Sequence, residues 1–189
     1  YFVIPYTIGD YLADMPYEKV DTDHPSFAEA ESAVRQRIED LLAVKGNTTV
    51  DTFHKRLGKI MWDKCGMSRS AKGLEEAREE IQQLREEYWK DVKLVGTNEE
   101  LNMTLEKALR VADFMELGEL MVEDALERNE SCGGHFREES QTEEGEALRD
   151  DEHYKYVSCW SYDGADKPPV LYKEDLQFEN VKLTQRSYK

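Results

Sequence analysis

The residues in this sequence whose types and spacing could support chemistry gather in one short stretch, residues 129–139, Asn-Glu-Ser-Cys-Gly-Gly-His-Phe-Arg-Glu-Glu. It brings the thiol of Cys132, the imidazole of His135 and the guanidinium of Arg137 close together along the chain. Groups of these types bind metal ions or activate a cysteine nucleophile. Both kinds of chemistry therefore have to be weighed against the spacing of the residues.

A zinc site is the first candidate, with Cys132, His135, His153 and Cys159 as its four ligands. Cys132 and His135 are close enough to share a turn, but His153 and Cys159 are separated by a stretch typical of a strand. Structural zinc sites bring in both ligand pairs at short, turn-compatible intervals. The spacing therefore argues against zinc, and we expect no metal site.

A cysteine nucleophile is the second candidate, because His135 and Arg137 lie close enough to Cys132 to favour a thiolate. However, Cys132 follows the end of a predicted helix, where the partial negative charge of the helix dipole disfavours a thiolate. We therefore predict no catalytic residue in this chain. Cys65 and Cys159 are expected to be small buried residues.

Composition narrows the class of protein. The chain has 189 residues, with 41 acidic against 25 basic side chains and a net charge of −16. That balance argues against nucleic acid or an anionic membrane surface as the main partner. Three cysteines do not make a disulfide framework and indicate a reducing compartment. The length suits one helical domain with a small appendage.

Four stretches have apolar residues at helical spacing. The helices that these stretches predict must position the candidate site residues that follow Arg128. They cover residues 26–44, 48–66, 74–95 and 97–128. Each of three begins with a capping pattern, namely Ser26 with Glu29, Thr48 with Asp51, and Thr97 with Glu100. Antiparallel helices joined by short polar turns predict a mainly α fold, an up-and-down bundle of three to four helices.

The last of these helices is apolar on two sides. One side carries Leu101, Leu105, Leu109 and Ala112, and the other carries Phe114, Leu117, Met121 and Ala125. A helix that is apolar all round is usually buried all round. We therefore expect it to be the central helix, with both Leu109 and Phe114 in the core.

The chain changes character after the bundle. Residues 140–152 are acidic and poor in apolar side chains, which predicts an exposed, mobile loop. Residues 154–162 are β-prone, residues 163–166 form a turn pattern, and residues 170–172 supply a return strand. An isolated hairpin is marginally stable in water, so this small C-terminal β region must pack on the bundle or on another chain.

The N-terminal residues 1–12 are apolar at first and do not begin with methionine. They are too few to span a bilayer and lack the basic start of a signal peptide. We expect them to be the last part of an element that begins upstream of Tyr1.

The stretch from Glu130 to Arg137, followed by Arg149-Asp150-Asp151-Glu152, resembles a motif of one enzyme family. That motif is the Glu-Ser-Arg-Gly-Ala-His-x-Arg sequence, with a following Arg-(Asn/Asp)-Asp segment, in the flavoprotein subunit of succinate dehydrogenase and fumarate reductase. Residues 1–12 and the tail 184–189 also resemble this subunit, so the likeness extends over essentially the whole chain.

The motif matches at Ser131, Gly133, His135 and Arg137, whereas Cys132 stands where the family has arginine and Gly134 where it has alanine. The arginine's contacts cannot be carried over to Cys132. The two glycines let the chain turn sharply after the helix. On this resemblance, all five residues Ser131, Gly133, Gly134, His135 and Arg137 form an interface motif, with His135 and Arg137 presented on the outside of the turn toward other domains or subunits.

The resemblance implies three parts: residues 1–15 as the terminal helix of a truncated flavin-binding domain, residues 16–130 as the helical bundle, and residues 131–189 as the motif, acidic loop and β region. It places the FAD-binding and substrate-binding residues upstream, and no Gly-x-Gly-x-x-Gly pattern occurs in this chain. FAD is therefore expected in the full-length subunit and no cofactor in this chain by itself.

The resemblance also implies a reaction and partners. The full-length subunit would interconvert succinate and fumarate, passing electrons from or to FAD through an iron-sulfur subunit and a quinone. Its partners would be that iron-sulfur subunit and, indirectly, a membrane anchor subunit, with no nucleic acid. Its place would be cytoplasmic, peripheral to the inner face of the cell membrane. Two alternatives stay open: the C-terminal domain of an aspartate oxidase, and a helical interaction module without a redox role.

Overall fold

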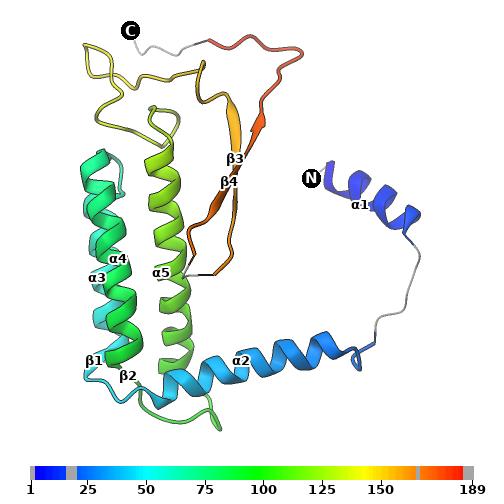
Figure 1. Cartoon of the computed structure of the whole chain (residues 1–189), viewed down its shortest axis with the longest axis vertical. Helices are drawn as coiled ribbons and strands as arrows, with labels where there is room; N and C mark the ends of the chain where they lie inside the picture. The colour runs from blue at the N-terminus through cyan, green and yellow to red at the C-terminus, as the bar shows by residue number, and fades with distance from the viewer. Residues whose placement is uncertain (1–2, 16–20, 165–166, 185–189) are drawn as a thin grey trace. The chain divides into compact units, whose positions relative to one another are not determined.

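The computed structural model describes residues 3–15, 21–164 and 167–184, and within them it contains five helices and four short strands (Figure 1). The chain divides into two compact units, residues 1–39 and 40–189. The first unit holds α1 (Val3–Asp14) and most of α2 (Pro25–Ala43). Among the described residues, no helix is long and apolar enough to cross a membrane.

The second unit is built on three helices that lie side by side, α3 (Val50–Lys64), α4 (Ala71–Asp91) and α5 (Met103–Glu127) (Figure 1). Their facing sides hold the core. Its largest fully buried side chains include Phe53, Leu74, Ile81, Leu84, Tyr88, Met115 and Val122. Along each helix these positions are three, four or seven residues apart, so the helical periodicity of the sequence correctly predicted a mainly α bundle.

The helix starts differ from all three predicted caps. Ser26 lies inside α2, which begins at Pro25, so it does not cap that helix. The side chain of Thr49, not that of Thr48, accepts the backbone N–H of Thr52 at the start of α3. Thr48 instead donates to Asp91 at 2.5 Å, and this bond is the main cause that lowers the pKa of the Asp91 carboxyl. The predicted capping pairs at Thr48 and Thr97 are therefore wrong. The Thr48 hydroxyl is bound to Asp91, and α5 begins only at Met103, so Thr97 is too far from its first turn.

Asn102 caps α5 in place of Thr97: its side-chain oxygen accepts the backbone N–H of Leu105 at 3.0 Å. We expect Asn102→Ala to lower the free energy of unfolding by about 1 kcal/mol, because a helix N–H loses its acceptor. Thr97→Ala is the matched control and should cost less. Equal losses in urea melts of the two variants would contradict this assignment.

Within the second unit α5 is covered on one face only, and this face takes residues from both predicted sides. Leu105, Ala108, Val111, Ala112, Met115, Gly118, Val122 and Ala125 are buried. On the other side Phe114, Leu117 and Met121 are 42%, 55% and 47% exposed. The expectation of burial on both sides is wrong for this chain, since α3 and α4 pack against the same face. α5 still contributes more buried residues than any other described helix.

Two pairs of strands complete the second unit. Strands β1 (Thr48–Thr49) and β2 (Val92–Lys93) form a short parallel pair, which the sequence did not predict. Strands β3 (Tyr156–Ser161) and β4 (Val170–Asp175) form the predicted antiparallel hairpin, although residues 165 and 166 of its turn lie outside the described residues.

The hairpin packs on the bundle, as we expected because an isolated hairpin is only marginally stable in water. Trp160 Nε1 donates to Asp124 at 2.7 Å, and Lys173 Nζ donates to Glu127 at 2.7 Å. Both acceptors are on α5. Tyr156, Ser158 and Trp160 alternate with more exposed residues, among them Cys159. The expected burial of Cys159 is therefore wrong, because the strand turns that residue to the solvent side.

Candidate functional site

The motif segment, residues 130–137, begins with a tight turn directly after α5. The backbone N–H of Cys132 donates to the carbonyl of His135 at 2.8 Å, and the reverse bond measures 3.0 Å. Gly133 has a backbone φ of +61°, a value that residues other than glycine rarely adopt. A Cβ at Gly133 would meet nothing within 4 Å. The preference for glycine at this position therefore comes from the backbone angle and not from a lack of space. The predicted sharp turn is confirmed, with Cys132, Gly133 and Gly134 exposed at its tip.

Two motif residues lie inside the structure. Ser131 and Arg137 are only 1% and 3% exposed. The Ser131 hydroxyl accepts the backbone N–H of Arg137 at 2.8 Å and donates to the Arg137 carbonyl at 3.2 Å. A single buried hydroxyl thus satisfies both backbone groups of Arg137. The base of the turn is thereby closed.

The Arg137 guanidinium lies against the end of α5. Its Nη1 donates to the carbonyls of Ala125 at 2.9 Å, Leu126 at 3.3 Å and Arg128 at 3.4 Å. The last carbonyls of a helix have no partner within the helix and carry partial negative charge, so a guanidinium suits them. The expectation that Arg137 points outward is wrong, because the turn at Gly133 lays it back on the helix it follows.

His135 is half-buried between two arginines. Its Nδ1 lies 2.7 Å from Arg69 Nη1, and its Nε2 lies 2.7 Å from the carbonyl oxygen of Arg128. A guanidinium can only donate, so Nδ1 accepts and Nε2–H donates. Burial lowers the pKa of His135, and the charges of Arg69 and Arg137 lower it further. This geometry holds the imidazole neutral.

The connection between α3 and α4 pairs with the motif segment. The N–H of Arg69 donates to the Phe136 carbonyl at 3.0 Å, and the N–H of Glu138 donates to the Arg69 carbonyl at 2.8 Å. Glu139 accepts the backbone N–H of Ala71 at 2.7 Å, in the first turn of α4. The motif segment and the residues after it thus join the ends of all three bundle helices.

Arg128 and Glu130 tie the hairpin into the same place. Arg128 donates to Glu130 at 2.9 Å and to the carbonyls of Tyr154 and Tyr156 at 3.0 and 3.1 Å. Glu130 is buried and accepts the N–H of Asp150 at 2.8 Å. Sequence reasoning missed Arg128 as a member of the site, although an arginine directly before the motif was a usable signal.

The acidic loop is more ordered than its composition suggested. The N–H of Ser131 donates to the Leu148 carbonyl at 2.9 Å, and the N–H of Leu148 donates to the Ser140 carbonyl at 3.0 Å. Glu143 and Glu144 are exposed, as expected. The loop thus lacks apolar anchors but has backbone anchors to the motif. Its mobility stays a prediction.

The groups considered for metal or nucleophile chemistry are dispersed or already engaged. Among the residues that the structure describes, no group of three or more His, Cys, Asp or Glu side chains could hold a metal ion. Both ring nitrogens of His135 have partners, and His153 Nδ1 lies 2.9 Å from Asp150. Cys65 is buried, and burial raises the pKa of its thiol.

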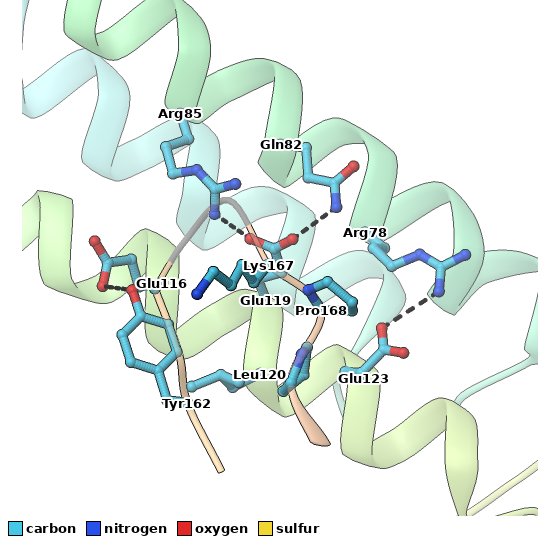
Figure 2. A pocket seen from close by; sticks show the side chains of 12 residues that line it. Arg78, Gln82, Arg85, Glu116, Glu119, Leu120, Glu123, Tyr162, Lys167 and Pro168 are labelled. Atoms are coloured by element: carbon cyan, nitrogen blue, oxygen red, sulfur yellow. Dashed lines mark hydrogen bonds and ion pairs between the residues drawn. The ribbon is translucent and has the colours of Figure 1, made fainter. Parts of the chain in front are cut away.

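A hollow of about 450 Å³ lies between α4, α5 and the residues after β3 (Figure 2). Arg78 pairs with Glu123 at 3.3 Å, and Gln82 and Arg85 both donate to Glu119. These pairs cross from α4 to α5 inside the hollow, as the dashed lines in Figure 2 show. Because its charges largely satisfy one another, we interpret the hollow as part of the packing and not as a ligand site.

Tyr162 closes one side of this hollow (Figure 2). Its hydroxyl donates to Glu116 at 2.6 Å. Burial, followed by the bond to Glu116, raises the pKa of Tyr162 to about 12. The phenol therefore stays protonated near neutral pH, and it acts as a further hydrogen-bonded link between the hairpin and α5.

His135 makes stability depend on pH. Its ordinary pKa is 6.5 and its folded pKa is lower, so the unfolded chain binds the proton more tightly. Stability should be constant above about pH 7 and should fall as the pH drops below 6.5 toward the folded value. His135→Gln should remove this slope, while His54→Gln should keep it. Urea melts between about pH 7.5 and 5, above the carboxyl range, measure it. Identical slopes in both variants would contradict the role of His135.

Comparison with known proteins shows which family this chain resembles. Residues 54–188 match the family described as fumarate reductase flavoprotein C-term. The fumarate reductase flavoprotein subunit of Helicobacter pylori is 30% identical over 174 residues, 88% of this chain and 23% of the relative. The L-aspartate oxidase of Synechocystis is 26% identical over 127 residues, 60% of this chain and 23% of the relative.

A solved structure of quinol-fumarate reductase with menaquinol molecules shares the fold, with a TM-score of 0.72. It is 23% identical and covers 94% of this chain and 29% of that chain. The chain thus spans about a quarter of the length of the relatives it matches, 23% of the Helicobacter pylori subunit. Since the family match takes in most of the bundle, the motif segment and the hairpin, this chain belongs to the fumarate reductase flavoprotein C-terminal family.

Proposed function

We propose that this chain is the C-terminal region of a flavoprotein subunit of succinate dehydrogenase or fumarate reductase. The full-length subunit interconverts succinate and fumarate and exchanges electrons through FAD with an iron-sulfur subunit and a quinone. The observation that carries this proposal is the family match over residues 54–188. The relatives' names describe a fumarate reductase subunit, which supports the substrate class without fixing the direction of the reaction.

The role of this region is to brace the flavin-binding part and to offer it a surface. We assign residues 1–15 to the end of the flavin-binding domain, residues 16–130 to the bundle and residues 131–189 to the motif, loop and β region. The exposed tip at Cys132, Gly133 and Gly134 is the part of the motif available to meet other domains or subunits. Ser131 and Arg137 hold that tip from inside.

FAD belongs to the full-length subunit in this proposal. The chain has no Gly-x-Gly-x-x-Gly sequence to approach a pyrophosphate. The hollow between α4 and α5 is lined largely by paired charges and, among the described residues, offers no glycine-rich turn at a helix start. The residues of this chain therefore do not fit FAD, and we assign them no step of the reaction. By itself the chain should be inactive.

The proposed partners are the rest of the flavoprotein subunit, the iron-sulfur subunit and, through it, a membrane anchor subunit. This arrangement would put the protein in the cytoplasm, at the inner face of the cell membrane. The solved relatives include quinol-fumarate reductase and the Sdh1 complex of Mycobacterium smegmatis, which supports a multisubunit assembly. The strongly negative net charge fits a protein partner better than nucleic acid.

An aspartate oxidase is the second candidate, because the Synechocystis enzyme is 26% identical over 127 residues. It would carry FAD but act on L-aspartate. A helical interaction module without redox chemistry is the remaining alternative, and it would carry no flavin anywhere in its full-length protein.

One protein preparation distinguishes the three candidate functions, namely the succinate dehydrogenase or fumarate reductase subunit, the aspartate oxidase and the interaction module. The complete gene product that contains this chain is purified, its flavin absorbance is measured, and its turnover of fumarate, succinate and L-aspartate is compared. We expect FAD near one per chain and succinate–fumarate interconversion. Aspartate oxidation without fumarate reduction would favour the oxidase, and a colourless protein would favour the interaction module. This chain alone should show no flavin absorbance.

A further inference from the structure

The uncovered side of α5 is a continuous apolar stripe. Phe114, Leu117 and Met121 follow at intervals of three and four residues, so their side chains lie above one another on one face. They are 42%, 55% and 47% exposed. Single exposed apolar residues are normal on a protein surface, whereas a contiguous group marks a contact site. We call these three residues the free stripe.

The residues of the free stripe line two hollows. One, of about 590 Å³, contains Phe114 together with Val95 and Met103, which are 59% and 67% exposed. The other, of about 490 Å³, contains Leu117 and Met121 and reaches the hairpin. From Met103 to Met121 the helix rises about 27 Å at 1.5 Å per residue. Two hollows that follow one another along α5 suit a rod-like partner such as a helix.

The charged rim of these hollows is mostly satisfied within the chain. Lys107 pairs with Asp51 at 2.5 Å, and Arg110 pairs with Glu106 at 3.0 Å. At the other end, Asp124 accepts from Trp160 at 2.7 Å. A partner gains little from these groups, since breaking existing pairs offsets new ones. The surface left for recognition is apolar, so the face that covers it must be apolar as well.

We propose that the free stripe of α5 is the contact surface for an apolar helical face in the flavin-binding part of the same subunit. The proposal rests on the proposed function and names the surface through which this region braces the flavin-binding part. Relatives are much longer than this chain, which matches 23% of the Helicobacter pylori subunit. A full-length subunit therefore carries ample further structure on the same polypeptide.

The size of the stripe favours a partner on the same chain. A stable contact between separate proteins buries about 800 Å² on each side, more than three half-exposed side chains provide. A partner on the same polypeptide is held at high effective concentration, so a smaller apolar contact is sufficient. We therefore assign the free stripe to a partner on the same polypeptide. The experiment that tests this assignment also covers the two other possible partners, a second copy of the chain and the iron-sulfur subunit.

Thiol labelling of the full-length subunit, purified without other subunits, tests the contact. Leu117→Cys places a thiol in the free stripe, and Gln83→Cys places a matched thiol on the exposed face of α4. Maleimide labelling, followed peptide by peptide, should be at least roughly tenfold slower at position 117, because the thiol reacts only when the contact opens. In urea both positions should react at the same rate.

Equal native labelling at the two positions would overturn the proposal. So would protection at position 117 that develops only at high protein concentration or only after the iron-sulfur subunit is added. A second pair, Met121→Lys and Gln83→Lys, avoids dependence on one variant. The first should lower the melting temperature of the full-length subunit by several degrees and the second should not, and equal shifts would also contradict the contact.

The same preparation separates this inference from the proposed function. FAD content and fumarate reduction are measured in the unsubstituted subunit before labelling. If these are present and position 117 is unprotected, the function stands and the surface is wrong. If flavin is missing, the proposed function fails, and the assignment of the stripe to a flavin-binding part fails with it.

Discussion

Arg137→Ala should destabilise this chain by roughly 2–6 kcal/mol, because two carbonyls at the end of α5 each lose a charged hydrogen-bond donor. The guanidinium is 3% exposed and supplies hydrogen bonds to the carbonyls of Ala125 and Leu126. Without it these buried acceptors at the end of α5 lose a donor, each at a cost of about 1–3 kcal/mol. The ion pair with Glu139 adds little, because that carboxylate is 41% exposed.

The control is Arg110→Ala. Arg110 pairs with Glu106 on the surface of the same helix, and its side chain is 67% exposed. Pairs of this kind contribute about 0–1 kcal/mol. Urea melts of both variants at one pH measure the difference. If Arg137→Ala were as stable as Arg110→Ala, the guanidinium would not be capping α5, and an outward-facing role would regain support.

Much of the fold could be predicted from local sequence. The spacing of Leu74, Ala77, Ile81, Leu84 and Tyr88 predicted the buried face of α4, and all five are buried. Helical periodicity is a short-range property, so a single sequence contains it. The hairpin was predicted from β-prone residues around a turn for the same reason. Cap positions were less predictable, since Thr48 is drawn away by Asp91, which is 43 residues distant.

The candidate site was predictable only in part. The turn at Gly133 follows from two adjacent glycines after a helix. The partner of His135 is Arg69, which is 66 residues away, and no local pattern could point to it. The burial of Arg137 was also missed. Charged side chains are rarely buried unless paired, and here the partners are backbone carbonyls, which a sequence does not display.

The free stripe shows a further limit of sequence reasoning. Periodicity indicated apolar residues around much of α5, but the buried face takes members of both predicted sides and includes Met115 and Val122, which belonged to neither. α3 and α4 pack against the side of α5 on which Met115 and Val122 are buried. Within residues 40–189 the side that holds Leu117 stays open. The apolar pattern of a helix therefore includes residues that contact other helices of the bundle and residues that are left for contacts outside it.

Phe53→Ala should lower the free energy of unfolding by roughly 3–5 kcal/mol, the range for emptying a packed aromatic site. Phe53 is fully buried, and its ring meets that of Tyr88 edge-on at 5.0 Å between centroids. The Tyr88 hydroxyl donates to the Ala108 carbonyl at 2.7 Å. Loss of the Phe53 ring therefore leaves a cavity where α3, α4 and α5 meet.

Phe114→Ala is the matched control, because it removes the same ring from a site that is 42% exposed. In this chain it should cost clearly less than Phe53→Ala, since 42% of the Phe114 surface already faces water. In the full-length subunit its cost should rise, because the free stripe is covered there, whereas the cost of Phe53→Ala should stay the same. Denaturant melts of both variants in both proteins measure the four values. Equal costs for the two variants in this chain would show that Phe114 belongs to the core, as the sequence alone had predicted.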